Sequence, residues 1–200
     1  MAKSNKEWLR RHVTDHYVKQ ARKQGYRSRA AFKLLQLDGK ESIFKPGMTV
    51  LDLGAAPGGW SQVAAEKVKP GGRVIAIDLV EIAPISGVTA LKGDFRQLPE
   101  KHPIASRADV VLSDASPNLS GIANVDQARL LELGEAAIEL CRKVLKPDGV
   151  FVVKAFHGEA YDQLRALLKG AFANVKVVKP PASRGESAET YVVARGLLAE

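Results

Sequence analysis

The sequence predicts an α/β fold built on a mainly parallel β-sheet with helices on both of its faces. Three observations indicate this fold class. Short apolar runs rich in Val, Ile and Leu alternate with segments of helical periodicity along most of the 200 residues. The first apolar run passes through a turn of small residues directly into a helix. Polar side chains follow several later runs at similar positions, which is typical of parallel strands that end at one edge of a sheet.

In chain order, two helices are expected ahead of the first strand. Residues 4–23 have helical character but are too polar for a core helix. Residues 27–37 form an amphipathic helix, with Ser28 as candidate N-cap and Lys33 available to face the sheet. The first strand is expected at 49–53, and the helix after it starts at 60–66. Further strands are expected at 73–77, 88–91, 109–112, 150–153, 175–178 and 191–194, and helices at 126–145 and 161–168, with residues 146–149 ending the longer helix.

The turn after the first strand is the most informative local motif. Gly54, Gly58 and Gly59 have the spacing Gly-x-x-x-Gly-Gly, which differs from the Gly-x-Gly-x-x-Gly of dinucleotide binders. No Lys-Ser or Lys-Thr follows, as a triphosphate P-loop would require. Glycines here would let a ligand approach the main chain. We therefore favour a nucleoside-type ligand without a pyrophosphate, with S-adenosylmethionine as the leading candidate and a structural turn as the alternative.

Four polar residues follow the apolar parts of predicted strands, namely Asp78, Asp94, Asp114 and Lys154. Ligands of open parallel sheets bind at this edge. Asp78 lies 24 residues beyond Gly54, near the position of an acid that binds ribose hydroxyls. Asp94 is a candidate acceptor for an adenine amino group. An Asx-turn is the alternative for both.

The net charge of +8 is concentrated at the N-terminus. Residues 1–33 hold ten Lys and Arg against two acids, and the rest of the chain is neutral. Such a basic segment predicts contact with a polyanion, and we favour a nucleic acid. Four aromatic residues lie among these charges and either stack on unpaired bases or pack against the core: Trp8, Tyr17, Tyr26 and Phe32.

Several functional classes find little support in the composition. No apolar run approaches the 18 residues of a membrane span, and the N-terminus lacks the apolar core of a signal peptide, so we expect a cytoplasmic protein. The single cysteine, Cys141, permits no internal disulfide and is expected to be a buried thiol. The histidines His12, His16, His102 and His157 are scattered, so we expect no metal site.

Residues 52–62 (Asp-Leu-Gly-Ala-Ala-Pro-Gly-Gly-Trp-Ser-Gln) resemble the cofactor motif of the FtsJ-type RNA ribose-2'-O-methyltransferases. Residues 26–34, 113–118 and 183–191 share the resemblance, which runs almost from end to end. The chain is most similar to the bacterial members that act on a uridine of 23S ribosomal RNA. Ala115-Ser116 departs from the expected Met-Ala before Pro-Asn, at positions that look like spacers.

The resemblance implies a Rossmann-like S-adenosylmethionine-dependent methyltransferase fold, with a seven-stranded, mostly parallel sheet whose last strand is antiparallel. Residues 191–194 would then be the inserted strand and would bring Glu189 beside Lys154. It also implies a basic RNA-contacting extension at 1–25 and a methyltransferase domain at 26–200. The implied catalytic tetrad is Lys33, Asp114, Lys154 and Glu189, and the implied cofactor contacts, with the motif glycines, are Gly54, Gly58, Gly59, Trp60, Asp78, Asp94 and Asp114.

The chemistry would align a ribose hydroxyl with an activated methyl group and remove its proton. Lys154 is the best candidate to take or steer that proton. Burial and Lys33 would favour the neutral form of Lys154, whereas Asp114 and Glu189 would favour its charged form. Two roles for Lys154 therefore stay open, namely a general base and a charged group that orients the hydroxyl.

The expected partner is ribosomal RNA within the large subunit, and we expect a monomer. Three alternatives remain, namely the same reaction on tRNA or a cap, a non-catalytic RNA-binding ribosome-assembly factor, and a small-molecule methyltransferase. All four tetrad positions hold intact acids and lysines, which argues against lost chemistry. The concentration of the net positive charge in residues 1–33 argues against a small-molecule substrate.

Overall fold

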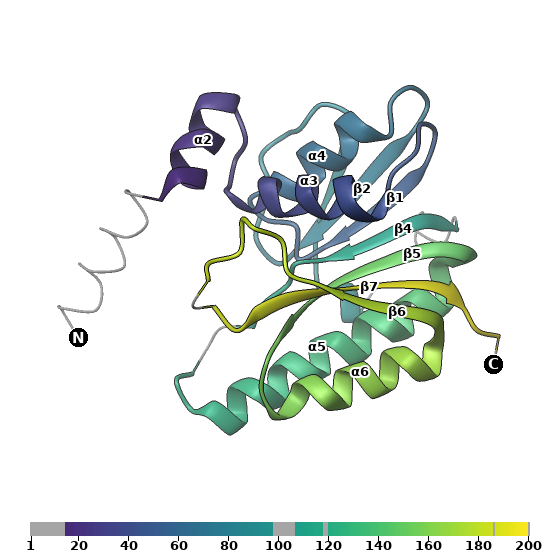
Figure 1. The fold of residues 1–200 in the computed structure, drawn as a ribbon. Coiled ribbons are helices and arrows are strands. Elements are labelled where there is room, and N and C mark those ends of the chain that lie inside the picture. Colours follow the sequence, from purple (N-terminus) through teal and green to yellow (C-terminus); the bar gives the residue numbers. More distant parts are fainter. Residues whose placement is uncertain (1–14, 98–106, 118–119, 186, 200) are drawn as a thin grey trace.

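The computed structural model describes residues 15–97, 107–117, 120–185 and 187–199. Within them, seven strands form one sheet in the order β3-β2-β1-β4-β5-β7-β6 (Figure 1). Every predicted strand is present; β1 has the predicted bounds, and the other six strands extend beyond theirs. The strands are β1 (Thr49–Leu53), β2 (Arg73–Asp78), β3 (Val88–Lys92), β4 (Ala108–Ser113), β5 (Leu145–Phe156), β6 (Phe172–Val178) and β7 (Glu189–Leu197).

The sheet is parallel except at β7. The pairs β1–β2, β2–β3, β1–β4 and β4–β5 are all parallel. β7 lies between β5 and β6 and pairs antiparallel with both. A parallel neighbour needs a crossover such as α6, whereas the chain returns from β6 to β7 through a loop, which sets the antiparallel direction. The predicted seven-stranded sheet with an antiparallel last strand is confirmed.

Helices cover both faces of the sheet (Figure 1). α3 (Ala30–Glu41) and α4 (Gly59–Lys67) lie on one face, and α5 (Ala123–Val144) and α6 (Glu159–Ala171) lie on the other. Successive strand residues alternate between the two apolar layers, so Val152 packs toward α3 and α4 while Val153 packs toward α5 and α6. Four of the five residues of β1 are buried because both faces are covered.

The helix boundaries correct some details of the sequence prediction. α3 runs from Ala30 to Glu41, and its N-cap is Arg29, without a side-chain cap; the prediction that Ser28 caps it was wrong. Residues 146–149 do not separate helix from strand, because β5 begins directly after α5 and these residues bulge between two paired positions. The predicted first helix corresponds to α2 (His16–Gln24), and its residues 4–14 lie outside the described residues.

Two further expectations concern Cys141 and membrane spans. Cys141 is buried in the layer between α5, α6 and the sheet, and burial raises the pKa of its thiol well above the usual value.

A short 3₁₀ helix, η1 (Phe95–Gln97), follows β3. Of the helices in the described ranges, none has both the length and the apolar character needed to cross a membrane.

Candidate active site

A cleft of about 820 Å³ opens at the edge where the parallel strands end. Asp78 is the last residue of β2, Asp94 follows β3, and Asp114 follows β4. All three line the cleft, and Lys154 of β5 lies beside Asp114. The volume falls in the range of about 300–1,000 Å³ typical of small-molecule sites. The cleft is lined by Gly54, Ala56, Asp78, Leu79, Val80, Gly93, Asp94, Phe95, Arg96, Asp114, Ala115, Ser116, Pro117, Arg129, Glu132 and Leu133.

Gly54 directly follows β1 and borders the cleft. Its φ of +68° lies in the left-handed region, which side chains rarely adopt. A Cβ on Gly54 would lie 2.6 Å from the Cβ and 2.8 Å from the Cα of Ala115. Glycine is therefore required here by the close approach of the β4 loop. The structural turn that the sequence analysis kept as an alternative is thus present at Gly54, and a contact of Gly54 with a cofactor remains a prediction.

Gly58 and Gly59 also meet protein atoms. A Cβ on Gly58 would clash with Ile85, and one on Gly59 would clash with the hydroxyl of Ser28. Gly59 borders a second cavity of about 150 Å³, whereas Gly58 lines neither cavity. The guanidinium of Arg27 fixes this loop, because it donates to the carbonyls of Pro57, Ala83 and Pro84 at 3.1, 2.6 and 2.7 Å.

Trp60 is almost fully buried. Its indole N–H donates to the carbonyl of Ala30 at 2.8 Å, and its ring centroid lies 5.5 Å from that of Tyr191. The side chain thus joins α4 to α3 and β7. Trp60 still borders the smaller cavity, so its predicted contact with a cofactor remains a prediction.

Asp52 is a buried acid beside the site that the sequence analysis did not select. It is fully buried, borders the smaller cavity, and accepts a hydrogen bond from Ser61 Oγ at 2.6 Å on Oδ2. Its other oxygen, Oδ1, has no partner in the described chain. Burial raises the pKa of Asp52 to about 7, opposed by the Ser61 hydrogen bond and assisted by the charges of Asp114 and Asp78. An acid inside an apolar strand was the available sequence signal.

Asp78 and Asp94 both form Asx-turns and line the cleft as well. Asp78 Oδ1 accepts from the backbone N–H of Val80, and Oδ2 accepts from that of Ala56 at 2.9 Å, which ties β2 to the β1–α4 loop. Asp94 accepts from the backbone and guanidinium of Arg96, whose hydrogen bonds lower the pKa of Asp94. The Asx-turn alternative is thus present for both acids, and their roles toward a cofactor remain predictions.

The four tetrad residues converge beside the cleft, and Asp114 is the one among them that lines it. Lys154 Nζ donates to the carbonyl oxygen of Asp114 at 2.6 Å and lies 3.2 Å from its Oδ1. Lys33 Nζ lies 2.7 and 2.8 Å from the two carboxylate oxygens of Glu189. All four side chains are largely shielded from solvent, with exposed fractions of 9–20 %.

Tyr191 connects the two ion pairs. Its hydroxyl donates to Asp114 Oδ1 at 3.0 Å and accepts from Lys33 Nζ at 3.3 Å. Burial, with the charges of Asp114 and Glu189, raises the pKa of Tyr191 far above its usual value, so it remains a neutral donor. No periodicity or spacing in the sequence marks Tyr191 as part of a polar site, because it occurs in an apolar strand.

Glu189 is held as a carboxylate. Burial alone would raise the pKa of Glu189, but the charge and hydrogen bond of Lys33, with the Ser183 hydroxyl at 3.0 Å, lower it below its usual value. The antiparallel register explains the placement, because Lys154 pairs with Tyr191 and Phe156 with Glu189 across β5 and β7. Ser183 is another polar residue that the sequence analysis did not select.

The aromatic residues of the basic segment pack together. Phe32 is buried, with its ring centroid 5.5 Å from that of Tyr17 and 5.7 Å from that of Tyr26. Packing is therefore the correct reading for Phe32, and base stacking was wrong. Trp8 lies outside the described residues.

Among the residues that the structure describes, no three His, Cys, Asp or Glu side chains are grouped to hold a metal ion.

Comparisons with known proteins agree with this geometry. Residues 26–197 match the family model described as FtsJ-like methyltransferase. The chain is 48 % identical over 199 residues to ribosomal RNA large subunit methyltransferase E of Nitrosospira multiformis, covering 97 % of each chain. A Plasmodium falciparum structure assigned as a ribosomal RNA methyltransferase aligns with a TM-score of 0.76 at 30 % identity, over 88 % of this chain and all of that one. Fibrillarin from Aeropyrum pernix, solved with S-adenosylmethionine bound, shares the fold (TM-score 0.61, 18 % identity, 84 % and 75 % covered).

Proposed function

The chain belongs to the FtsJ-like methyltransferase family, and from this premise we propose that it methylates a ribose 2'-hydroxyl of RNA. S-adenosylmethionine is the cofactor and supplies a methyl group activated by the sulfonium sulfur. The observation that carries the proposal is the convergence of Lys33, Asp114, Lys154 and Glu189 beside the cleft. Two amines and two carboxylates suit the alignment and deprotonation of a hydroxyl.

The cavities fit the chemical groups of S-adenosylmethionine. The orphaned Oδ1 of Asp52 is a buried acceptor suited to an ammonium group, and the adjoining cavity would hold the amino-acid portion. Asp78 is suited to ribose hydroxyls at the carboxyl end of β2. Leu79 and Val80 are 65 % and 63 % exposed along the cleft, and they offer apolar surface to a purine.

The tetrad would act on the RNA hydroxyl. Lys154, held by Asp114, directs its amine toward the hydroxyl oxygen and stabilises negative charge there as the proton leaves to water or to a carboxylate. Tyr191 holds the Asp114 carboxylate in place through its hydroxyl. Lys33, balanced by Glu189, adds a second positive charge near the same oxygen.

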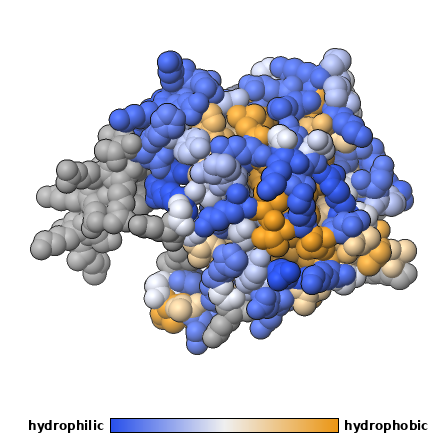
Figure 2. Space-filling view, in the orientation of Figure 1, coloured by the Kyte–Doolittle hydropathy of each residue, from blue (hydrophilic) through white to orange (hydrophobic). Residues whose placement is uncertain are grey.

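The basic N-terminal segment would bind the RNA backbone. In α2, Lys19, Arg22 and Lys23 are exposed, and Figure 2 shows this helix as a hydrophilic surface. We therefore assign residues 1–25 as an RNA-contacting extension and 26–200 as the methyltransferase domain. Asp15 supports this arrangement, because it accepts hydrogen bonds from Arg29 and Arg184 and so anchors α2 to the domain.

The proposed substrate is 23S ribosomal RNA in the large subunit, with a uridine as the modified nucleotide, and the proposed site of action is the cytoplasm. The similarity to ribosomal RNA large subunit methyltransferase E of Nitrosospira multiformis supports ribosomal RNA as the substrate. A monomer suffices, because one chain supplies all the site residues described above.

The test is incubation of the protein with labelled S-adenosylmethionine and undermethylated large ribosomal subunits, followed by nucleoside analysis. Label on the 2'-oxygen of a uridine in 23S RNA is the expected result. Label on a base would overturn the chemistry, and label appearing only on added tRNA would overturn the substrate. Binding without any transfer would favour an assembly factor.

A further inference from the structure

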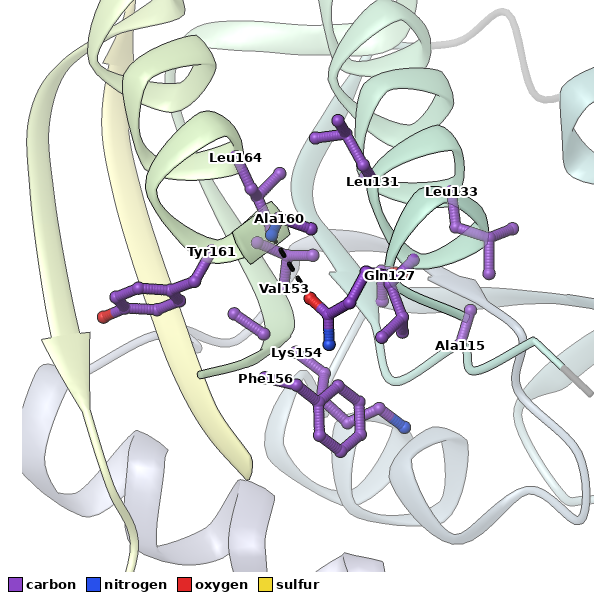
Figure 3. A pocket seen from close by; sticks show the side chains of 14 residues that line it. Ala115, Gln127, Leu131, Leu133, Val153, Lys154, Phe156, Ala160, Tyr161 and Leu164 are labelled. Carbon is purple, nitrogen blue, oxygen red and sulfur yellow. Dashed lines mark hydrogen bonds between the residues drawn. The ribbon is translucent and has the colours of Figure 1, made fainter. Parts of the chain in front are cut away.

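Phe156 is the last residue of β5 and lies at the rim of the tetrad. It follows Lys154 by two positions, and residues two apart on a strand project to the same side. The Lys154 amine lies 5.6 Å from the centroid of the Phe156 ring, and Phe156 pairs with Glu189 across β7. Figure 3 shows the ring and the Lys154 side chain together, away from Leu131 and Leu164.

The packing of Phe156 differs from that of the other phenylalanines. All six phenylalanines of the chain fall within the described ranges. Five of them are members of an apolar core cluster or pack against one, and Phe156 alone does neither. Its ring is half-buried and borders a small hollow with Gln127, Leu130 and Tyr161 (Figure 3). Core packing therefore does not account for an aromatic residue at this position.

A nucleotide whose ribose hydroxyl lies beside Lys154 must place its base nearby, because the base and the 2'-hydroxyl are carried by adjacent carbons of the sugar. Single-stranded RNA is commonly held by bases that stack on aromatic side chains. We propose that Phe156 is the platform on which the base of the methylated nucleotide stacks. The inference rests on the proposed function and adds a contact that positions the target nucleotide.

A matched pair of variants tests the platform in turnover. Phe156→Leu keeps an apolar side chain but removes the π-face, whereas Phe156→Trp enlarges it. Phe44→Leu is the control, because Phe44 is also half-buried but lies between α3 and β1, at the opposite edge of the sheet. The assay measures kcat and KM for undermethylated large subunits, with the Kd for S-adenosylmethionine and the Tm measured alongside.

For Phe156→Leu we expect KM for the particles to rise roughly tenfold or more, since one stacked base contributes about this much to binding. The Kd for S-adenosylmethionine and the Tm should stay at the wild-type values. Phe156→Trp and Phe44→Leu should each keep KM for the particles at the wild-type value. A fall in kcat at unchanged KM would show instead that the ring acts only on the Lys154 amine, and would overturn the proposal.

A second measurement does not depend on methyl transfer. The tryptophan emission of Phe156→Trp, after subtraction of the wild-type signal, should be quenched by a short oligouridine, while that of Phe44→Trp should not. Equal quenching in the two variants, or none in either, would overturn the stacking contact. Quenching without ribose methylation by the wild-type protein would retain the platform and reject the proposed reaction.

Discussion

The amine of Lys33 lies 2.7 Å from a carboxylate oxygen of Glu189, although 156 residues separate them in the chain. Both side chains are only 12 % exposed, so each charge depends on the other for compensation. The pair reaches Asp114 through the Tyr191 hydroxyl. One connected polar network thus joins α3, β7 and the loop after β4.

A double-mutant cycle with Lys33→Met and Glu189→Gln should give a coupling free energy of about 1–3 kcal/mol at pH 7 in urea unfolding. The pKa of Glu189 is lowered below 4.5 in the folded protein. The contribution of the ionised Glu189 carboxylate to the free energy of unfolding is therefore complete above pH 4.5. This contribution is lost as the pH falls through the pKa that Glu189 has in the folded protein. The exposed Lys143–Glu139 pair of α5 is the control, for which at most about 1 kcal/mol is expected. Equal coupling in the two pairs would contradict the shielded geometry.

Replacement of Lys154 by Ala should lower kcat by about 10²- to 10⁴-fold, because the group that steers the hydroxyl proton is lost. The Kd values for S-adenosylmethionine and for RNA should change little. Lys146→Ala is the matched control, since Lys146 lies on the same strand and is paired with Asp109 at the opposite end. A variant at position 154 with near-normal turnover would exclude Lys154 from the chemistry.

The buried carboxyl of Asp52 predicts a pH-dependent stability. Its pKa rises from 3.8 to about 7 on folding, so the folded state binds the proton more tightly between these values. The free energy of unfolding should therefore fall as the pH rises from about 4 to 7. Asp52→Asn has no titrating carboxyl at this position, so its free energy of unfolding should not fall with pH in this way. The free energy of unfolding of Asp52→Asn minus that of the wild type should therefore increase by on the order of 3 kcal/mol over the same pH range.

The control for Asp52 is the exposed Asp148→Asn, whose stability should stay within about 0.5 kcal/mol of wild type throughout. The Asp52→Asn protein should also bind S-adenosylmethionine at least tenfold more weakly by calorimetry, because the unpaired Oδ1 would no longer offer a charge. Unchanged affinity would remove Asp52 from the cofactor site.

Gly54→Ala should be far more damaging than Gly47→Ala. Both glycines have positive φ, so each substitution carries a backbone cost of about 1–2 kcal/mol. Only Gly54 has a neighbour, Ala115, within clashing distance, whereas a Cβ at Gly47 meets nothing within 4 Å. Overpacking adds about 1–3 kcal/mol at Gly54. Thermal unfolding measures the difference, and similar Tm values would show that the loop after β4 yields to the added methyl group.

Removal of two exposed charges of α2, with Arg22→Gln and Lys23→Gln, should weaken RNA binding and reduce its salt dependence. Each lost phosphate contact lowers the slope of log K against log salt by about 0.7–0.9. Lys45→Gln with Lys69→Gln removes the same charge at the opposite edge of the sheet and should leave the slope unchanged. Equal slopes for both variants would indicate that α2 does not contact the RNA.

Much of the fold could be predicted because its signals are local. Buried strands, the Gly-rich turn and the polar residues after strands depend on neighbouring residues, and they placed Asp78, Asp94, Asp114 and Lys154 at one edge. The resemblance of short motifs supplied the antiparallel last strand and the expectation that Glu189 lies beside Lys154, whereas in the observed register Lys154 pairs with Tyr191 and Glu189 pairs with Phe156.

The sequence by itself therefore determined the order of elements, the sheet edge that carries the polar residues, and the family. Only the tertiary structure decided that Tyr191 bridges two ion pairs, that Asp52 keeps an unpaired oxygen, and that Trp60 is used in packing. The physical reason is that hydrogen-bond partners and burial depend on how distant segments pack, which neither periodicity nor local spacing encodes.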